Sequence, residues 1–451
     1  MKIVVNNRAE IWQAPPRLLT EMKAELTVAN PLYIEAVRFN RWTGNIPKRL
    51  KFYSERDGAI LVPRGYTPMA IKKIDAAGVS YEIVDETRVL PEIEFDVSRI
   101  VPREYQADAI GYLCASRFGV LTAPTGSGKT VMALAMIAKR KQPSLVIVHT
   151  KELLHQWRDR AVAFLNLPKK EIGIIGDGKF KIGERLTVAL VQSLYKRAAE
   201  IKHNFGHLIV DECHRAPSRT FTDAVTEFDC RFVLGLSATP YRRDELSELI
   251  FWFLGPLRHS VPPDALIESG QVMDANVIIR QTGFSSGADL TTQYSEVITD
   301  MTENAARNDL IARDVKRASD TSAGVALVLT DRVPHCDLLR ESILRYVKRP
   351  ETVAILTGKT KTKERTAIVE RLDARQIKIL IATGQLIGEG FDCKWLANLF
   401  LCTPIKFEGR LVQYLGRVLR PAEGKSHAVI YDYVDEQLWL AARERLSVYQ
   451  K

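Results

Sequence analysis

The stretch LTAPTGSGKTVMALAM, residues 121–136, joins an apolar run to a helical pattern through a glycine-rich turn. Gly126 and Gly128 let the backbone curl so that its N–H groups point at phosphate oxygens, and the positive end of the following helix adds to this attraction. Lys129 would then reach the β- and γ-phosphates, and the Thr130 hydroxyl would ligate Mg²⁺. The alternative is a glycine turn without a ligand. The flanking strand and helix favour a site for ATP and Mg²⁺, with the predicted contacts Thr125, Gly126, Ser127, Gly128, Lys129 and Thr130.

A phosphate-binding loop of this kind needs carboxylates from a second strand. HLIVDECH, residues 207–214, has two directly after an apolar run. Asp211 is predicted to hold Mg²⁺ through its water shell, and Glu212 to act as general base on the attacking water. Cys213 and His214 raise the alternative of zinc. Adjacent residues on a strand point to opposite faces, and no Cys or His pair stands nearby at metal spacing, so we expect no structural zinc and a packed Cys213.

The composition bounds the class of protein. The chain has 451 residues, of which 46% are hydrophobic and 26% charged, with a formal net charge of +10. A basic balance favours an acidic polymer such as nucleic acid as partner, although many soluble proteins are mildly basic. The six cysteines form no C-x-x-C pair, which argues against a disulfide framework and for a reducing compartment. No signal peptide and no membrane-spanning run is visible, so we expect a cytoplasmic protein.

Short runs rich in Val, Ile and Leu alternate with helical patterns from about residue 100 onward. Such runs mark strands buried on both faces, and the alternation indicates βαβ units with parallel sheets. Residues 289–318 read as helix. The first part of the chain has mixed strand and helix signals and is predicted to form a small α+β domain. We therefore predict an α/β protein with three domains, at residues 1–97, 98–257 and 258–451.

APTGSGKT, DECH and LGLSATP, in this order, resemble the first motor lobe of superfamily 2 helicases. ILIATGQLIGEGFDC, residues 379–393, and VQYLGRVLRP, residues 412–421, resemble motifs of the second lobe. With REYQ and KELLHQW, these motifs look closest to the UvsW and XPB types, among them the branch-migrating helicases of tailed phages. The resemblance covers about residues 98–440.

This resemblance implies two RecA-like lobes that close around ATP and Mg²⁺. Arg417 and Arg420 would come from the second lobe as arginine fingers that stabilise the γ-phosphate in the transition state. Two arginines three apart lie on one helix face, and the alternative is a solvated basic face. Two departures from the family pattern are visible. Ala123 stands at a usual glycine position, and Arg242-Arg243-Asp244 stands where XPB-type proteins have Arg-Glu-Asp.

The resemblance also implies roles for individual side chains. The implied nucleotide contacts are Arg103, Gln106, Gly390, Asp392 and Gln413. The residues implied to couple nucleotide state to motion are His214, Ser237 and Thr239. The implied contacts to strand phosphates are Thr150, Gln192, Ser193, Thr330, Thr357 and Thr383. Each of these hydroxyls could instead cap a helix.

RFNRWTGNIPKRLKFY, residues 38–53, carries five cations with no acid between them, interleaved with aromatic residues. Cations neutralise phosphates and aromatic rings stack on exposed bases, so this patch is predicted to contact DNA. The alternative is a hairpin with packed aromatic residues and a solvated basic edge. The predicted contacts are Arg38, Arg41, Trp42, Lys48, Arg49 and Lys51.

Together these features predict an ATP-dependent DNA helicase or translocase. By resemblance it moves 3′ to 5′ and unwinds or branch-migrates forks, Holliday junctions and displacement loops in recombination, replication restart or repair. Its partners would be branched and single-stranded DNA and proteins of recombination or replication, in the bacterial host cytoplasm if a phage encodes it. The alternatives are an RNA helicase, a duplex translocase that does not separate strands, and a binding scaffold with an inactive phosphate loop.

Overall fold

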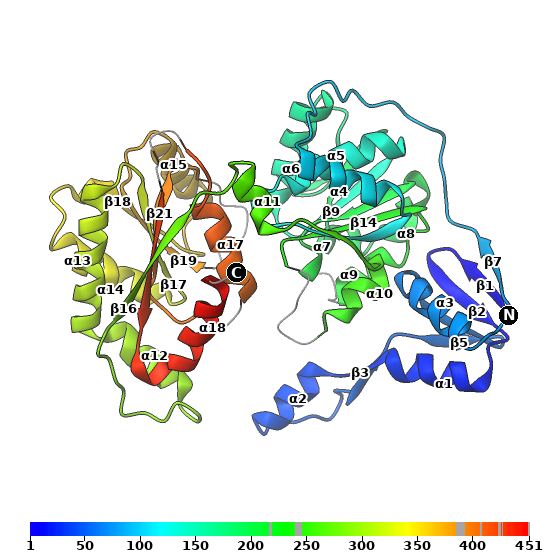
Figure 1. The fold of residues 1–451 in the computed structure, drawn as a ribbon, viewed down its shortest axis with the longest axis horizontal. Coiled ribbons are helices and arrows are strands. Elements are labelled where there is room, and N and C mark those ends of the chain that lie inside the picture. The colour runs from blue at the N-terminus through cyan, green and yellow to red at the C-terminus, as the bar shows by residue number, and fades with distance from the viewer. Residues whose placement is uncertain are drawn as a thin grey trace. The chain divides into compact units, whose positions relative to one another are not determined.

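The computed structural model describes residues 1–215, 219–239, 246–384, 393–405, 408–422, 425 and 427–449. The chain divides into two compact units, whose helices and strands are labelled in Figure 1. The first unit consists of Met1–Ala123 and Gly128–Val261. The second consists of Pro124–Ser127 and Pro262–Lys451.

The N-terminal part of the first unit has a five-stranded sheet of its own, in the order β5-β6-β2-β1-β7. Its pairs are antiparallel except for β1 with β7. The apolar residues on one face of β1 and β2, such as Ile3 and Ile11, are fully buried. The strands are β1 (Lys2–Val5), β2 (Arg8–Trp12), β5 (Ser54–Arg56), β6 (Ala59–Pro63) and β7 (Glu82–Asp85). The helices and the separate strand pair are α1 (Pro16–Glu25), β3 (Thr27–Ala29), α2 (Pro31–Arg38), β4 (Arg49–Lys51) and α3 (Thr67–Ala76).

This N-terminal region shares a hydrophobic core with the larger sheet of the same unit. The ring of Phe52 lies 5.8 Å from that of Trp252 on helix α10 (Glu248–Leu254). The buried Arg64 donates to the Cys230 carbonyl at 2.6 Å. These contacts fasten the N-terminal region to the rest of the unit.

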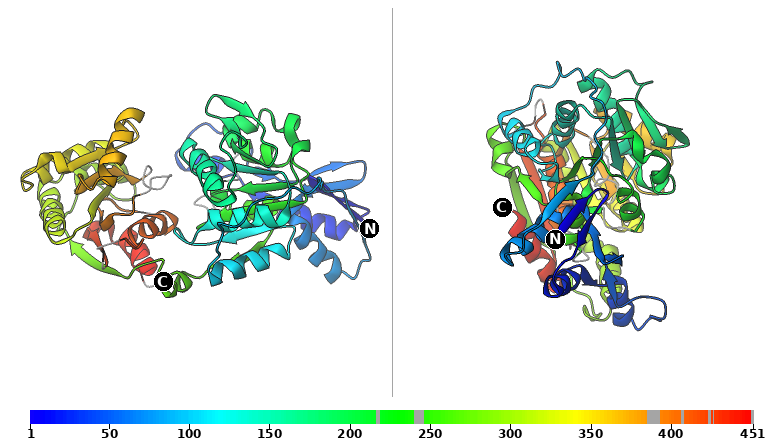
Figure 2. Two further views of the ribbon diagram at one scale, coloured as in Figure 1. Left: turned by 90° about the horizontal axis from the view of Figure 1, so that it is seen from above. Right: turned by 90° about the vertical axis from the view of Figure 1, so that its right-hand side faces the viewer.

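An eight-stranded sheet forms the centre of the first unit, in the order β11-β10-β12-β9-β13-β14-β8-β15. It is parallel except for the β10–β11 pair, and helices lie on both of its faces (Figure 2). The strands are β8 (Phe118–Thr122), β9 (Ser144–Val148), β10 (Gly173–Gly176), β11 (Lys179–Lys181), β12 (Leu186–Leu190), β13 (His207–Val210), β14 (Phe232–Ser237) and β15 (Leu257–Ser260). The other helices are α4 (Glu104–Cys114), α5 (Lys129–Arg140), α6 (Lys151–Leu165), α7 (Val191–Leu194), α8 (Ala198–Ile201) and α9 (Arg219–Val225).

The second unit has a six-stranded, fully parallel sheet in the order β16-β21-β20-β17-β19-β18. The strands are β16 (Ala275–Gln281), β17 (Val325–Thr330), β18 (Val353–Leu356), β19 (Ile379–Thr383), β20 (Leu396–Leu401) and β21 (Ala428–Val434). The helices are α11 (Pro263–Glu268), α12 (Tyr294–Glu303), α13 (Ala305–Thr321), α14 (Val333–Leu344), α15 (Thr362–Asp373), α17 (Glu408–Val418) and α18 (Trp439–Tyr449). The predicted α/β fold, with two parallel sheets and a small α+β region before them, is confirmed.

Some local predictions need correction. The helical stretch 289–318 is two helices, because the Asn304 side chain accepts a hydrogen bond from the Arg307 amide at 2.9 Å and so begins α13 afresh. The β10–β11 pair and the strands β15 and β16 lie in stretches that the sequence did not mark as strands. β15 and β16 are edge strands with half-exposed residues, so they lack the continuous apolar run of a buried strand.

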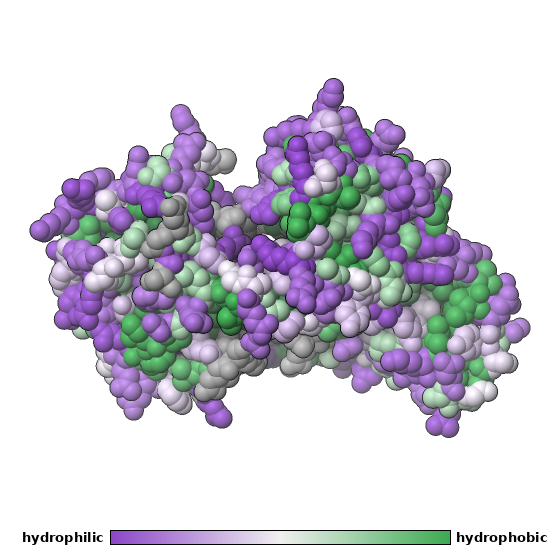
Figure 3. Space-filling view, turned by 45° about the horizontal axis from the view of Figure 1, so that its top comes forward, coloured by the Kyte–Doolittle hydropathy of each residue, from purple (hydrophilic) through white to green (hydrophobic). Residues whose placement is uncertain are grey.

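The surface is mainly hydrophilic on the face drawn in Figure 3, with separate apolar patches. No helix among the described residues is both long and apolar enough to cross a bilayer.

Candidate nucleotide site and nucleic-acid contacts

The glycine-rich loop runs from the end of β8 to the start of α5. Gly126 and Gly128 have φ angles of 94° and 80°, in the left-handed region that glycine adopts without strain. The Lys129 ammonium donates to the Ala123 carbonyl at 2.8 Å and so folds back over the loop. The loop therefore has the curled backbone and nearby ammonium that a triphosphate requires.

Gln106 connects the loop to the segment before it. The Arg103 amide donates to the Gln106 side-chain oxygen at 3.0 Å, which caps α4. A Cβ atom on Gly128 would lie 2.5 Å from the Gln106 amide nitrogen, so no other residue fits there without movement. Gln106 is thus brought to the phosphate loop, while an adenine contact by Gln106 or Arg103 stays a prediction.

Asp211 is a buried carboxylate beyond the end of β13, with 7% of its surface exposed. The indole N–H of Trp157 on α6 donates to Asp211 Oδ2 at 2.7 Å. Burial, followed by the nearby Glu212 carboxylate, raises the pKa of Asp211 to about 6, against the opposing effects of Trp157 and Lys129. A cation near this carboxylate would favour its ionised form.

The strand β13 ends at Val210, so DECH lies after the strand rather than on it. Glu212 has a φ of 49°, a left-handed conformation that costs a residue with a side chain about 1–2 kcal/mol. Residues 213–215 form a 3₁₀ turn, so the argument against zinc from strand alternation was wrong in its premise. Cys213 is fully buried, as predicted. The described residues contain no cluster of three or more His, Cys, Asp or Glu side chains suited to a metal ion.

His214 lies between Glu212 and β14. Its Nδ1 lies 3.1 Å from Ser237 Oγ and 3.4 Å from Glu212 Oε2. Ser237 Oγ donates to the Thr239 carbonyl at 2.7 Å, so it must accept from His214, and Nδ1 carries the proton. The Thr239 amide donates back to Ser237 Oγ at 3.1 Å. The three predicted coupling residues therefore form one hydrogen-bonded chain.

Arg417 and Arg420 lie at the C-terminal end of α17, and both are partly exposed. The helix ends at Val418, so Arg420 follows the helix rather than lying on its face, which corrects the expectation of a shared helix face. Gly390, Asp392 and residues 242–244 lie outside the described residues, as does the side chain of Gln413.

Two family models match the chain. Residues 99–242 match "Type III restriction enzyme, res subunit", and residues 308–422 match "Helicase conserved C-terminal domain". The DNA 3′-5′ translocase XPB2 of Sulfurisphaera tokodaii is 26% identical over 79% of this chain and 88% of its own length. The ATP-dependent DNA helicase uvsW of Enterobacteria phage T4 is 25% identical over 88% of this chain and 82% of its own.

This chain is a superfamily 2 helicase of the UvsW and XPB type. Its fold is also similar to a fragment described as an HsdR subunit of a type I restriction enzyme from Vibrio vulnificus YJ016. That likeness has a TM-score of 0.59 at 23% identity and covers 78% of the helicase and 66% of the fragment.

Most of the residues predicted to contact DNA strand phosphates make hydrogen bonds within the protein or are buried. Thr150 caps α6 by accepting from the Leu153 amide at 3.3 Å, and Gln192 donates to the His149 carbonyl at 3.5 Å. The buried Thr330 hydroxyl lies 2.8 Å from His335 Nδ1. Thr357 and Thr383 are also buried, whereas Ser193 is partly exposed. Contact of these six residues with DNA stays a prediction.

The basic patch at residues 38–53 divides into two parts. Phe39 and Trp42 are exposed, Trp42 by 79%, and the Arg41 guanidinium lies 5.2 Å from the Phe39 ring. Phe52, in contrast, packs on Trp252. The exposed cations of the patch are Arg38, Arg41, Lys48, Arg49 and Lys51. The segment therefore has exposed aromatic residues at one end and a packed one at the other, and its contact with DNA stays a prediction.

A recess of about 280 Å³ lies where this patch meets α9. It is lined by cations and aromatic residues from the N-terminal region, among them Arg8, Lys51 and Tyr53, and by Thr222 and Asp223 of α9. Its cations are suited to backbone phosphates.

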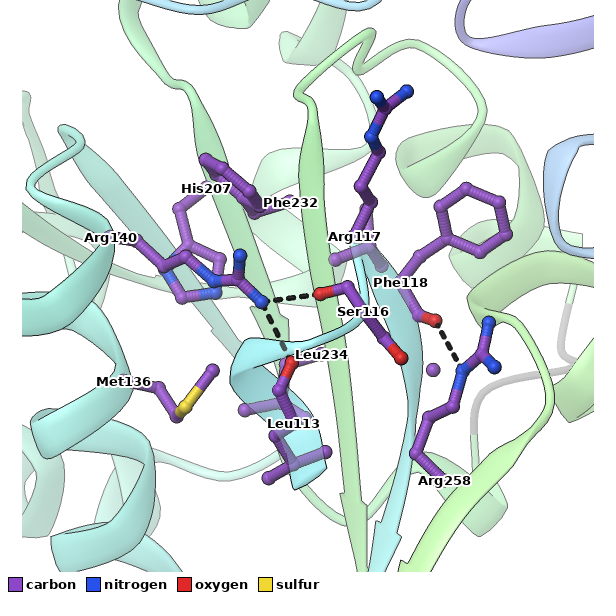
Figure 4. A pocket seen from close by; sticks show the side chains of 12 residues that line it. Leu113, Ser116, Arg117, Phe118, Met136, Arg140, His207, Phe232, Leu234 and Arg258 are labelled. Atoms are coloured by element: carbon purple, nitrogen blue, oxygen red, sulfur yellow. Dashed lines mark hydrogen bonds between the residues drawn. The ribbon is translucent and has the colours of Figure 1, made fainter. Parts of the chain in front are cut away.

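A far smaller pocket of about 10 Å³ lies at the amino ends of β8, β13 and β14 (Figure 4). Arg140 closes it by donating to the carbonyls of Leu113 and Ser116, and stacks 4.1 Å from the Phe232 ring. Burial, together with Arg140, lowers the pKa of His207 to about 3. The pocket has room for about one water, so these groups are structural.

Sequence reasoning missed Trp157 as a functional residue. The motif KELLHQW, which contains Trp157, was noted only for its resemblance to the family. The buried spacing of Leu154, Trp157 and Ala161 marks an inward helix face, which a periodicity argument could have found. No local signal pairs that face with Asp211, because the two residues are 54 positions apart.

Proposed function

We propose that this helicase is an ATP-driven motor that moves along DNA and branch-migrates or unwinds forks and four-way junctions. The observation that carries the proposal is the continuous arrangement of Asp211, Glu212, His214 and Ser237 beside a phosphate loop closed by Lys129. This arrangement can bind a triphosphate, activate water and pass the state of the site to a neighbouring strand.

The residues fit Mg²⁺ as the metal that accompanies ATP. Hydroxyl and carboxylate oxygens are the ligands that Mg²⁺ prefers, and Thr130 and Asp211 supply them. When bound, the ion neutralises charge that develops on the phosphates. Asp211 would hold it, and Trp157 would fix the orientation of Asp211.

Glu212 would take the proton of the attacking water. Its Oε2 is buried and has no hydrogen-bond partner among the described residues, so a lone pair remains to accept a proton. Arg417 and Arg420 would stabilise the negative charge of the γ-phosphate when the lobes close. Opening and closing would then move the lobes along a strand.

The assignment to DNA rests on relatives that are named a DNA 3′-5′ translocase and an ATP-dependent DNA helicase. It is supported by Trp42, which is exposed among five cations and free to stack on an unpaired base. The three domains 1–97, 98–257 and 258–451 would serve as DNA grip, ATP-binding lobe and arginine-supplying lobe.

Branch migration of a synthetic four-way junction tests the proposal. The wild-type chain with ATP and Mg²⁺ should convert the junction to duplex products, and Lys129→Ala should not. Lys139→Ala, which changes an exposed lysine on the same helix, is the matched control. ATP hydrolysis with no strand exchange on junctions or forks would contradict branch migration and favour a duplex translocase.

A further inference from the structure

The C-terminal end of α17 is held by groups from outside the helix. The last carbonyls of a helix lack partners within it. Here the Leu419 carbonyl accepts from the Met273 amide at 2.8 Å. The carbonyls on either side, those of Val418 and Arg420, both accept from the ammonium of Lys425, the latter at 2.8 Å. Three successive carbonyls at the end of the arginine-bearing helix are therefore fixed.

Lys425 is only partly exposed, so its ammonium loses much of its hydration. Burial lowers the pKa of Lys425 to about 8, and the nearby Cys393 thiol opposes that shift. The negative end of the helix dipole offsets part of this cost. A lysine that is kept at such a cost, with its donors aimed at the backbone of Arg420, has a role beyond solubility.

We propose that Lys425 is a positioning residue for ATP hydrolysis, which fixes the backbone at Arg420 and thereby aims Arg417 and Arg420 at the γ-phosphate. This inference rests on the proposed function of the two arginines. The Arg420 side chain leaves the backbone at the residue whose carbonyl Lys425 binds, so any motion there displaces the guanidinium. A displacement of about 1 Å in a catalytic group can cost about 10²-fold in rate.

Steady-state ATP hydrolysis on a forked DNA separates this role from general stability. Lys425→Met should lower kcat about 10²-fold and leave the KM for ATP within about twofold, since the change leaves the glycine loop, Lys129 and the acidic residues unaltered. Lys425→Arg, which can still donate to both carbonyls, should recover most of kcat. Lys348→Met, on an exposed lysine of the same unit, should match the wild type.

The pH profile gives a second, independent readout. The wild type should lose kcat as the pH rises above about 8, because the neutral amine of Lys425 is a weaker hydrogen-bond donor to its two carbonyls than the ammonium. Lys425→Arg should keep its kcat up to at least pH 9.5, because an arginine stays protonated. If Lys425→Met fails to fold, the pH profiles of the wild type and Lys425→Arg test the inference by themselves. A ratio of their kcat values that does not change with pH overturns the inference.

Arg420→Ala separates the role of Lys425 from the role of the arginines. A loss of kcat in Arg420→Ala together with a wild-type kcat in Lys425→Met overturns the role of Lys425 and leaves the proposed function standing. Wild-type kcat in Arg420→Ala overturns the arginine role on which the inference rests.

Discussion

Asp211 and Glu212 follow a central strand of the first unit, whereas Arg417 and Arg420 lie at the end of a helix in the second. Asp211 is buried and accepts a hydrogen bond from the indole of Trp157, whereas Glu212 is partly exposed and lies 3.4 Å from His214 Nδ1. The arginines are partly exposed, and bonds from outside their helix fix the backbone beneath them. A buried carboxylate needs a partner that satisfies its oxygens, while the direction of a partly exposed arginine depends on how firmly its backbone is held.

The largest loss of kcat is expected from a change at the arginines of the second unit. Arg420→Ala should lower nucleic-acid-stimulated kcat by about 10³–10⁵-fold, because the transition state would lose one of the two guanidinium groups that stabilise it. Single-turnover ATP hydrolysis measures the loss. Arg340→Ala, on an exposed arginine of the same unit, is the control. A loss of less than tenfold would show that Arg420 does not contact the γ-phosphate.

The acidic side should respond almost as strongly. Glu212→Gln should lower kcat by about 10²–10⁴-fold while ATP still binds, because the amide cannot accept the proton of water. Fluorescent ATP-analogue binding and hydrolysis are measured on one preparation, beside the exposed Glu184→Gln. Intact DNA-stimulated hydrolysis in Glu212→Gln would remove this residue as general base.

Removing a supporting donor should have a smaller effect with a characteristic pH dependence. Trp157→Phe removes the N–H that binds Asp211 Oδ2 and leaves a buried acceptor short of a bond, at a cost of about 1–3 kcal/mol. The pKa of Asp211 should then rise above about 6. Since Asp211 works as a carboxylate, the fall of kcat at acid pH should move to higher pH.

A pH profile of kcat for Trp157→Phe checks this shift. Trp439→Phe, on an exposed tryptophan, provides the matched profile. Superimposable acid limbs in all three proteins would mean that Trp157 has no influence on the ionisation of Asp211.

The smallest effect is expected at the N-terminal patch. Trp42→Ala should leave the melting temperature unchanged, because the ring is 79% exposed, and should weaken fork binding by about 1 kcal/mol, the value of one modest base stack. Phe52→Ala should instead lower the melting temperature, because its ring packs on Trp252. Fork titration at one salt concentration and thermal melting separate the two. A destabilised Trp42→Ala with normal fork affinity would reverse the assignment.

Contiguous motifs were sufficient to predict the parallel sheets, the glycine loop and the order of the acidic residues. Their strength is local: a strand, a turn and a helix within about 16 residues determine where Lys129 lies. Supports that cross long stretches of chain could not be predicted. Trp157 reaches Asp211 across 54 positions through sheet topology. Lys425 is only five positions from Arg420, but it follows the end of the helix, where no periodicity predicts the direction of a side chain. The DECH turn was placed on a strand because its preceding apolar run gives no sign of where pairing stops.

If this helicase is a branch-migrating motor, its ATP turnover depends on branched DNA. The most direct measurement is hydrolysis at one salt concentration with single-stranded DNA, duplex DNA, a fork, a four-way junction and single-stranded RNA, alongside Lys129→Ala. We expect the strongest stimulation by the fork or the four-way junction, and none in Lys129→Ala. Equal or stronger stimulation by RNA would contradict the assignment to DNA, and absence of turnover with every nucleic acid would contradict the motor itself.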